Sequence, residues 1–139
     1  MTDRHALINE TIAALEQRHV HPNVAKVAAE LLTEMAGSDR HTVHSNARVL
    51  LAHLIKWAYQ PALRSRSWDD TISEHRMRIM DAIDDMPSLR PYLEGNWQSW
   101  WTRSRASAIK QMRANPFNPV PDACPWTLDQ IMDEDWLPE

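Results

Sequence analysis

Glycine is nearly absent from this sequence: only Gly37 and Gly95 occur among its 139 residues. Tight hairpin turns and the loops that wrap around phosphate groups both depend on glycine, so an all-β fold and a glycine-rich nucleotide-binding loop are both disfavoured. Alanine (16) and leucine (12) outnumber valine (6) and isoleucine (8), which favours helix over strand. The composition therefore predicts an all-α protein.

Cysteine and long apolar runs are scarce as well. A single cysteine, Cys124, excludes an internal disulfide and a zinc site built from several cysteines. No window approaches about 18 uncharged apolar residues, the length that a membrane-spanning helix needs. The N-terminal segment carries charges within its first apolar stretch, unlike a secretory signal. We expect a cytoplasmic protein with no membrane partner, and the length predicts one domain over residues 1–139.

Charge is unevenly distributed along the chain. The formal net charge is −4, which argues against general binding of polyanions. Residues 40–78 hold seven basic and three acidic side chains, whereas residues 122–139 hold six acids and neither lysine nor arginine. Either the acidic tail docks on the basic middle of the same chain, or both segments are simply solvated.

Proline marks the boundaries between the predicted elements. Pro22, Pro61, Pro87 and Pro91 separate long intervals without proline, and proline is poorly tolerated inside a helix. Gly37 permits a positive φ and is expected to end the second helix. These signals predict an antiparallel bundle of about five long helices plus a short C-terminal helix. The long helices are expected at 3–18, 22–36, 38–59, 67–86 and 88–114, the proline-rich loop at 116–125, and the short helix from Thr127.

Polar residues at the predicted helix starts are candidate caps, because their side chains accept hydrogen bonds from free backbone amides. The candidates are Thr2 or Asp3, Ser38, Ser67 with Asp70, Ser88, and Thr127 with Gln130. Apolar residues at helical spacing predict the core. The expected core residues are Leu50, Leu54, Ile72, Ile79 and Ile83, and the second helix has its own pattern in Val24, Val27, Ala28, Leu31, Leu32 and Met35.

Three motifs carry a family resemblance. They are LLAHLIKWAYQP at 50–61 with RSRSW at 64–68, PSLRPYL at 87–93, and CPWTLDQI at 124–131 with DWLP at 135–138. In this order they resemble the bacterial "domain of unknown function 29" family. The resemblance implies an all-α fold and, as the name says, no established activity. It covers roughly residues 29–139, while the stretch from Arg18 to Pro22 departs from the pattern of the family.

The end of the third predicted helix and the turn after it concentrate cationic and aromatic side chains. The pairs His53/Trp57 and Lys56/Gln60 each have a spacing of four, which places both members on one helix face. Arginine in such a corner can bind a carboxylate or phosphate, so a small anionic-ligand or enzymatic site is one interpretation. The candidate ligand-binding residues are His53, Lys56, Trp57, Gln60, Arg64, Arg66 and Trp68.

A structural role is the alternative for the same corner. In that case His53, Trp57 and Trp68 are mostly buried. Arg64 or Arg66 then packs against an aromatic ring or pairs with an acid of the C-terminal tail.

Other chemistry finds little support. Seven histidines include His41 and His44 on one helix face, but no metal-binding motif accompanies them, so we expect surface histidines, no metal and no cofactor. Cys124 lies beside acids, which disfavours a reactive thiolate. Weak nucleic-acid binding through Arg40–Arg78 is conceivable, yet the acids at the start of the fourth helix would repel phosphates.

The main hypothesis is a non-enzymatic helical module that binds protein, either a second copy of itself or another partner. Seven tryptophans are more than so small a core usually hides. Trp97, Trp100 and Trp101 cannot all face one side of a helix, so one of them is expected to be exposed as an anchor.

Overall fold

The computed structural model describes residues 3–17, 22–112 and 119–139. The described residues form helices and no strand, which confirms the all-α prediction. Four of the helices are long, rather than about five. The elements are α1 (Arg4–Gln17), α2 (Pro22–Tyr59), the single 3₁₀ turn η1 (Pro61–Leu63), α3 (Arg66–Asp85), α4 (Leu89–Gln111) and the short α5 (Leu128–Met132).

Helix α2 is one continuous helix of 38 residues, so the break expected at Gly37 was wrong. Gly37 does not have a positive φ, and Ser38 lies inside the helix rather than capping a new one. A glycine inside a helix costs only about 1 kcal/mol relative to alanine. Packing offsets that cost, because Ala36, Asp39 and Val43 on either side of the glycine are all buried.

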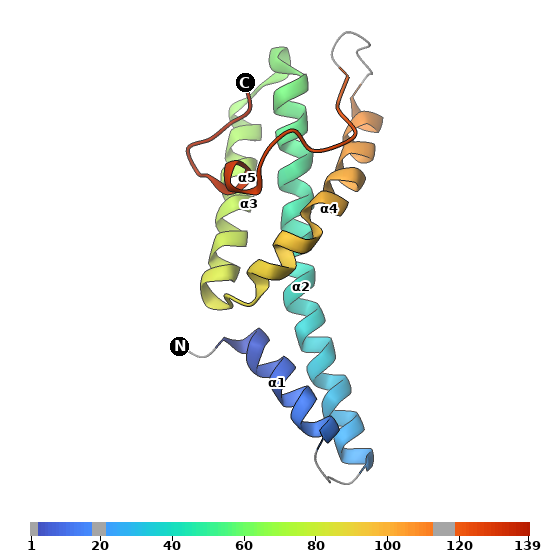
Figure 1. Cartoon of the computed structure of the whole chain (residues 1–139). Helices are drawn as coiled ribbons and strands as arrows, with labels where there is room; N and C mark the ends of the chain where they lie inside the picture. Colours follow the sequence, from blue (N-terminus) through green and yellow to red (C-terminus); the bar gives the residue numbers. More distant parts are fainter. Residues whose placement is uncertain (1–2, 18–21, 113–118) are drawn as a thin grey trace.

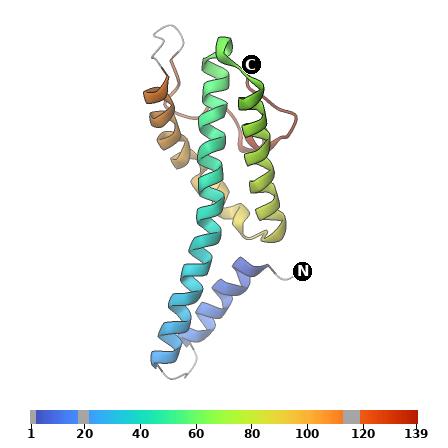
Figure 2. The same cartoon turned by 180° about the vertical axis from the view of Figure 1, so that it is seen from behind.

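The other long helices all pack on α2. Helix α3 runs back beside its second half, and α4 crosses that half obliquely (Figures 1 and 2). Helix α1 packs on the first half, so these two segments project away from α3 and α4 as a helical hairpin. We call residues 4–17 and 22–38 the arm, and the remaining described residues the body.

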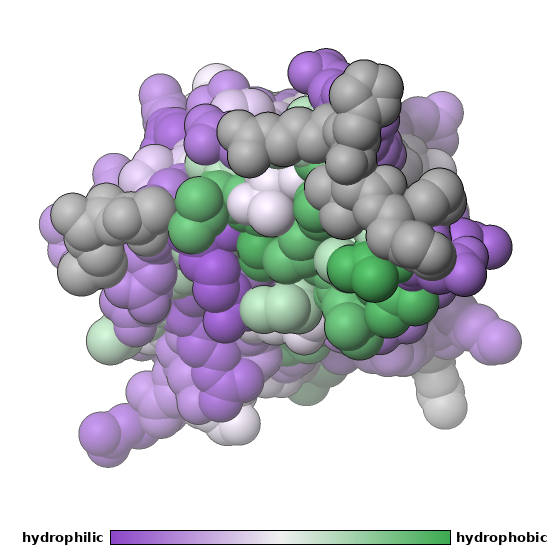
Figure 3. Space-filling model, turned by 90° about the horizontal axis from the view of Figure 1, so that it is seen from below, coloured by the Kyte–Doolittle hydropathy of each residue, from purple (hydrophilic) through white to green (hydrophobic). Residues whose placement is uncertain are grey.

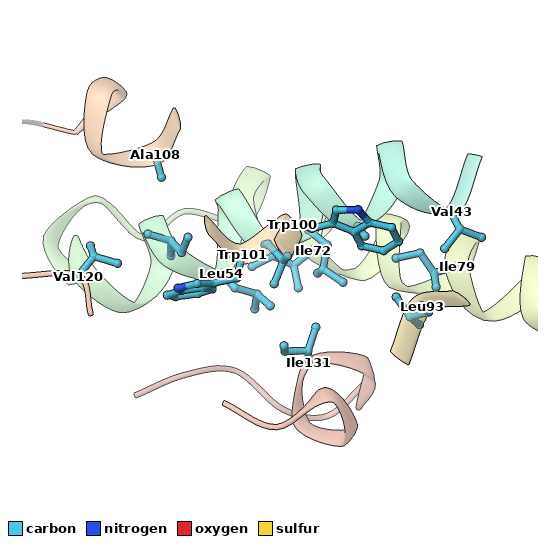
Figure 4. Packing of buried hydrophobic residues seen from close by; sticks show 14 of the residues in the cluster. Val43, Leu54, Ile72, Ile79, Leu93, Trp100, Trp101, Ala108, Val120 and Ile131 are labelled. Atoms are coloured by element: carbon cyan, nitrogen blue, oxygen red, sulfur yellow. The ribbon is translucent and has the colours of Figure 1, made fainter. Parts of the chain in front are cut away.

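The core lies in the body, where α2 meets α3 and α4 (Figure 4). Of the predicted core residues, Leu50, Leu54, Ile72 and Ile79 are buried, as expected. Ile83 is half-buried and packs against the edge of the cluster.

The C-terminal tail covers the opening between α3 and α4. Three indoles follow one another edge to face: the ring centroids of Trp101 and Trp126 lie 5.3 Å apart, and those of Trp126 and Trp136 lie 5.6 Å apart. Arg76 of α3 ends this series, with its guanidinium 5.9 Å from the Trp136 ring centroid. Its Nε also donates a 2.7 Å hydrogen bond to the carbonyl of Ile131. Aromatic stacking and one buried cation thus fasten the tail to both helices.

The acids of the tail pair mainly with α4. Asp122 forms a 3.1 Å ion pair with Arg105, and Asp129 lies 3.8 Å from Arg90. Both arginines lie outside the basic stretch 40–78. Arg76, which belongs to that stretch, contacts the tail through the carbonyl of Ile131 and the ring of Trp136. The described residues therefore do not show the acidic tail docked on the basic middle, which was one of the two alternatives; the tail acids are exposed, and two of them pair with α4.

Two more of the predicted caps do not act as caps through their side chains. Helix α3 begins after Ser65, whose side chain accepts a hydrogen bond from the Trp68 amide, so neither Ser67 nor Asp70 caps it. Ser88 precedes α4 without a side-chain cap bond. At α5 the predicted capping box of Thr127 and Gln130 is present.

Asp3 fastens the start of α1 to the turn between α3 and α4. Its carboxylate accepts a 3.0 Å hydrogen bond from the Ala6 amide, which confirms it as the cap of α1. It also accepts bonds of 2.6 and 3.0 Å from the amide and hydroxyl of Ser88. This turn is the place where the base of the arm joins the body.

His5 extends the same network to α2. It is 3% exposed, its Nδ1 lies 2.8 Å from the Ser88 hydroxyl, and its Nε2 accepts a 3.0 Å hydrogen bond from Nε of Arg40. An ion pair between Arg4 and Asp39 lies beside it. Because Arg40 donates to Nε2, the ring proton of neutral His5 is on Nδ1.

We expect His5 to make stability depend on pH. Burial, followed by the charge of Arg40, lowers the pKa of folded His5 below its usual 6.5, despite the opposing effect of Asp3 and Asp39. The unfolded chain therefore binds a proton more readily, so the contribution of His5 is complete above pH about 6.5 and is lost as the pH falls below that value. His5→Gln should lower the melting temperature at pH 7.5 and flatten its decline between pH 7.5 and 5.5. An equally steep decline in the variant would contradict this role.

We also expect Arg76 to be the main attachment of the tail. Arg76→Ala leaves the buried carbonyl of Ile131 without its donor, which should cost about 1–3 kcal/mol of unfolding free energy and expose the tail to limited proteolysis. Arg78 supplies the control, because it is exposed and its ion pair is with Glu74, one turn away on the same helix. Arg78→Ala should change stability by less than about 0.5 kcal/mol. Equal losses in the two variants would show that Arg76 does not hold the tail.

Candidate functional site

Arg64 closes the C-terminal end of α2. Its Nε donates a 2.8 Å hydrogen bond to the carbonyl of Trp57, and its guanidinium lies 5.2 Å from the centroid of the Trp57 ring. A cation at this end also suits the negative pole of the helix. Arg64 thus packs on an aromatic ring, as the structural alternative predicts, and in the described residues it forms no ion pair with the tail.

The other residues of the predicted corner do not all lie in one groove. His53, Trp57 and Trp68 are mostly but not fully buried, as the structural alternative predicts, and Arg66 is exposed. Only two of the seven candidates, His53 and Lys56, line a groove that runs between α2 and α4. Within the described part of the chain, this groove brings together two of the seven side chains, and the ligand-binding role of the corner stays a prediction.

The groove between α2 and α4 has a volume of about 420 Å³. One wall is formed by α2, with Ser45, Arg48 and Lys56, and the other by α4, with Ser107 and Gln111. Sequence analysis did not identify Ser45, Arg48, Ser107 or Gln111. The two walls come from segments that are far apart in the chain, and only the crossing of the helices brings them together.

Positive charge surrounds this groove. No Asp or Glu is among its lining residues, whereas Arg48 and Lys56 are. The pKa of nearby His44 is lowered by burial and then by the charges of Arg48, Arg103 and His41, so these side chains all lie close to it. The pKa of His53 is lowered by burial, and Lys56 and His75 act in the same direction, although its bond to a backbone carbonyl opposes them. The groove is suited to bind an anion.

His41 and His44 were both expected at the surface, which is right for His41 and wrong for His44. His44 stacks on Trp100 with ring centroids 4.8 Å apart, while His41 is exposed and its Nε2 lies 3.2 Å from the Ser45 hydroxyl. In the described part of the chain, no three His, Cys, Asp or Glu side chains come together as a potential metal site.

Asp3, His5 and Ser88 are the residue types of a hydrolase triad, but their order is different. In a triad, histidine lies between serine and the acid and takes the proton of the serine. Here Ser88 lies between the other two, and its hydroxyl donates to Asp3. His5 has its proton on the nitrogen that faces Ser88 and so cannot accept another there. The arrangement can hold α1 in place but cannot activate Ser88.

Cys124 is not a reactive thiol. Burial raises its pKa to about 11, and the hydrogen bond to the carbonyl of Trp126 only partly opposes this effect. At neutral pH the side chain is therefore protonated and a poor nucleophile. The sequence-based expectation was right, but the main cause is burial rather than neighbouring acids.

The apolar exposure of the molecule is concentrated on the arm. None of the seven tryptophans is exposed; Trp100 and Trp101 are buried and Trp97 is half-buried, so the predicted exposed indole anchor was wrong. Instead, α2 exposes four aliphatic side chains at a spacing of three or four residues. This exposed stripe consists of Val24 (60% exposed), Val27 (55%), Leu31 (57%) and Met35 (44%).

Sequence analysis assigned the stripe to one apolar face together with Ala28 and Leu32. The structure divides that face in two. Leu32 is half-buried and Ala36, one turn later, is buried on the side that α1 covers. A hydrophobic pattern gives the width of an apolar face but not the number of neighbours that cover it.

Within the described residues, no helix has both the length and the apolar character to cross a membrane.

Comparison with known protein families gives a match. The sequence model of the family described as "Domain of unknown function DUF29" matches residues 1–137, which includes the first helix as well as the motifs from residue 50 onward. No curated protein and no solved structure matches this chain. Because the match spans nearly the whole sequence, the chain belongs to the DUF29 family.

Proposed function

We propose that this protein is a non-enzymatic helical interaction module whose binding surface is the exposed stripe of the arm and whose partner is a second copy of the chain. The observation that carries the proposal is the exposure of Val24, Val27, Leu31 and Met35 on one face of α2. Viewed from below, the molecule has its apolar surface gathered in one region of an otherwise mostly hydrophilic face (Figure 3). Contiguous exposed apolar surface of this kind is typical of docking sites.

The direction of the stripe supports pairing with another helical hairpin. Leu31 and Leu32 are consecutive, so their side chains point about 100° apart around α2. Helix α1 covers the side of Leu32, and nothing in the described residues covers the side of Leu31. A helix of a four-helix bundle has two neighbours at about such an angle. The arm therefore has the geometry of half a bundle.

A second copy supplies the matching half. A two-fold axis across the stripe pairs each helix with its antiparallel equivalent, so Val24 of one chain lies near Met35 of the other and Val27 lies near Leu31. Such closed two-fold dimers are the commonest oligomers. Pairing two stripes covers eight side chains, of each of which about half the surface is exposed in the monomer, and contributes about 8 kcal/mol at about 1 kcal/mol each. Since association itself costs several kcal/mol, we expect a reversible dimer rather than a permanent one.

The test is the mass of the protein in solution as its concentration rises. We expect sedimentation equilibrium to show a monomer–dimer equilibrium in the micromolar range. Leu31→Glu should shift it fully to monomer while leaving the helical circular dichroism spectrum unchanged, because the side chain is exposed in the monomer.

Met77 provides a matched control, since it is 55% exposed on α3, outside the arm. Met77→Glu should leave the dimer intact. A native protein that remains monomeric to about 100 µM would refute self-association, as affinities in that range are the lower end of specific binding. A dimer that survives Leu31→Glu would show that another surface forms it.

A further inference from the structure

The groove between α2 and α4 is a positively charged site on a negatively charged protein. The facing segments, residues 40–60 and 95–112, contain six lysines and arginines and no acid, although the chain as a whole has a net charge of −4. Arg105 forms an ion pair with Asp122 and donates hydrogen bonds to the backbone carbonyls of Val120 and Pro121. Arg48 and Lys56 line the groove itself, and in the described residues no carboxylate pairs with either of them.

Small residues create the space between the two cations. Arg48, Ala52 and Lys56 follow at intervals of four, so Ala52 lies midway along the same wall, and the cations start about 12 Å apart along the helix axis. Across the groove, α4 contributes the buried Ser104, whose hydroxyl reaches the carbonyl of Arg48 at 3.5 Å. A short side chain on each helix leaves a hollow with a cation at either end.

The donors of the groove are spread over both walls. Hydroxyls of Ser45 and Ser107 and the amide of Gln111 face the same space as the two cations. A carboxylate, with two coplanar oxygens, is best matched by a single bidentate arginine, whereas a phosphoryl group accepts hydrogen bonds on several oxygens pointing in different directions. The volume of about 420 Å³ falls within the range of small-molecule sites and exceeds what one inorganic phosphate fills.

We propose that the α2–α4 groove binds a small molecule that carries two or more phosphoryl groups, with Arg48 and Lys56 each holding one anionic end. Ser45, Ser107 and Gln111 donate to the remaining oxygens. This site differs from the predicted corner. Arg64 donates its hydrogen bond to the carbonyl of Trp57, and Arg66 lies on the surface outside the groove. The groove also shares no residue with the stripe, so an experiment can disprove self-association without disproving phosphate binding, and the reverse.

Inorganic pyrophosphate is a suitable probe, followed by isothermal titration calorimetry and by amide chemical shifts. We expect saturable binding with one pyrophosphate per chain and shifts centred on residues 45–56 and 104–111. Arg48→Gln and Lys56→Gln should each raise the Kd roughly tenfold or more, the loss expected for a hydrogen bond between charged groups. Ala52→Met should weaken binding as well, because it fills the hollow and leaves every charge in place.

Arg66→Gln is the matched control, since it removes an exposed cation outside the groove and should leave the Kd unchanged. Weaker binding in Arg66→Gln, or unchanged binding in Arg48→Gln and Lys56→Gln, would overturn the assignment. So would tighter binding of succinate than of pyrophosphate, because the site would then prefer carboxylates. Binding of a single-stranded oligonucleotide across a wider surface, without saturable pyrophosphate binding, would replace the proposal with a nucleic-acid interface.

The pKa of His53 provides a second way to detect pyrophosphate binding in the groove. Its Nδ1 lies 2.9 Å from the carbonyl of Val49, so in the neutral ring Nε2 has no proton. The charges of Lys56 on α2 and His75 on α3 help to hold its pKa below the usual value, and the α4 wall contributes only uncharged groups. A bound anion counters those charges, so histidine NMR should show the pKa of His53 rising when pyrophosphate is added. A pKa that does not move would place the anion elsewhere.

Discussion

The continuity of α2 is the constraint on which the rest of the structure depends. Helices α1, α3 and α4 each pack on α2, whereas α3 and α4 touch each other little and share their opening with the C-terminal tail. If α2 ended at Gly37, the first half would be free to fold back onto the body. Because it continues, residues 22–38 extend beyond α3 and α4, and α1 alone covers them.

Sequence patterns correctly predicted the helix ends that result from the covalent structure of a residue, namely proline. Pro61 and Pro87 each lie two residues after the last residue of a helix, because proline lacks the amide proton that the next helical turn requires. Gly37 was misjudged because glycine only permits a helix to end. Whether it does so depends on tertiary contacts, here the burial of Ala36 and Asp39 against elements far away in the chain. Similarly, Ser65 and Ser67 are both chemically able to cap α3, and the pattern alone did not distinguish them.

The proposed binding surfaces were harder to predict than the fold. The sequence pointed to His53 and Lys56, since basic and aromatic residues cluster there, but it grouped them with Arg64, which belongs to the helix end. Arg48 escaped notice because nothing in its local sequence shows that Ser107 of α4 lies opposite. The stripe was recognised as apolar and assigned to the interior for the same reason: periodicity shows which residues share a face, and only the three-dimensional arrangement shows which faces have a neighbour.

The two surfaces also share one side of α2. Eighteen residues correspond to about five full turns, so Leu31 points in the same direction as Val49, and Met35 in the same direction as His53. Val49 and His53 line the groove, while Leu31 and Met35 belong to the stripe. The helix thus changes from apolar to basic along a single face, with the change near the point where the arm joins the body. A second chain seated on the stripe would end beside the groove. If binding at one surface then alters affinity at the other, thermodynamic linkage requires the effect to be reciprocal.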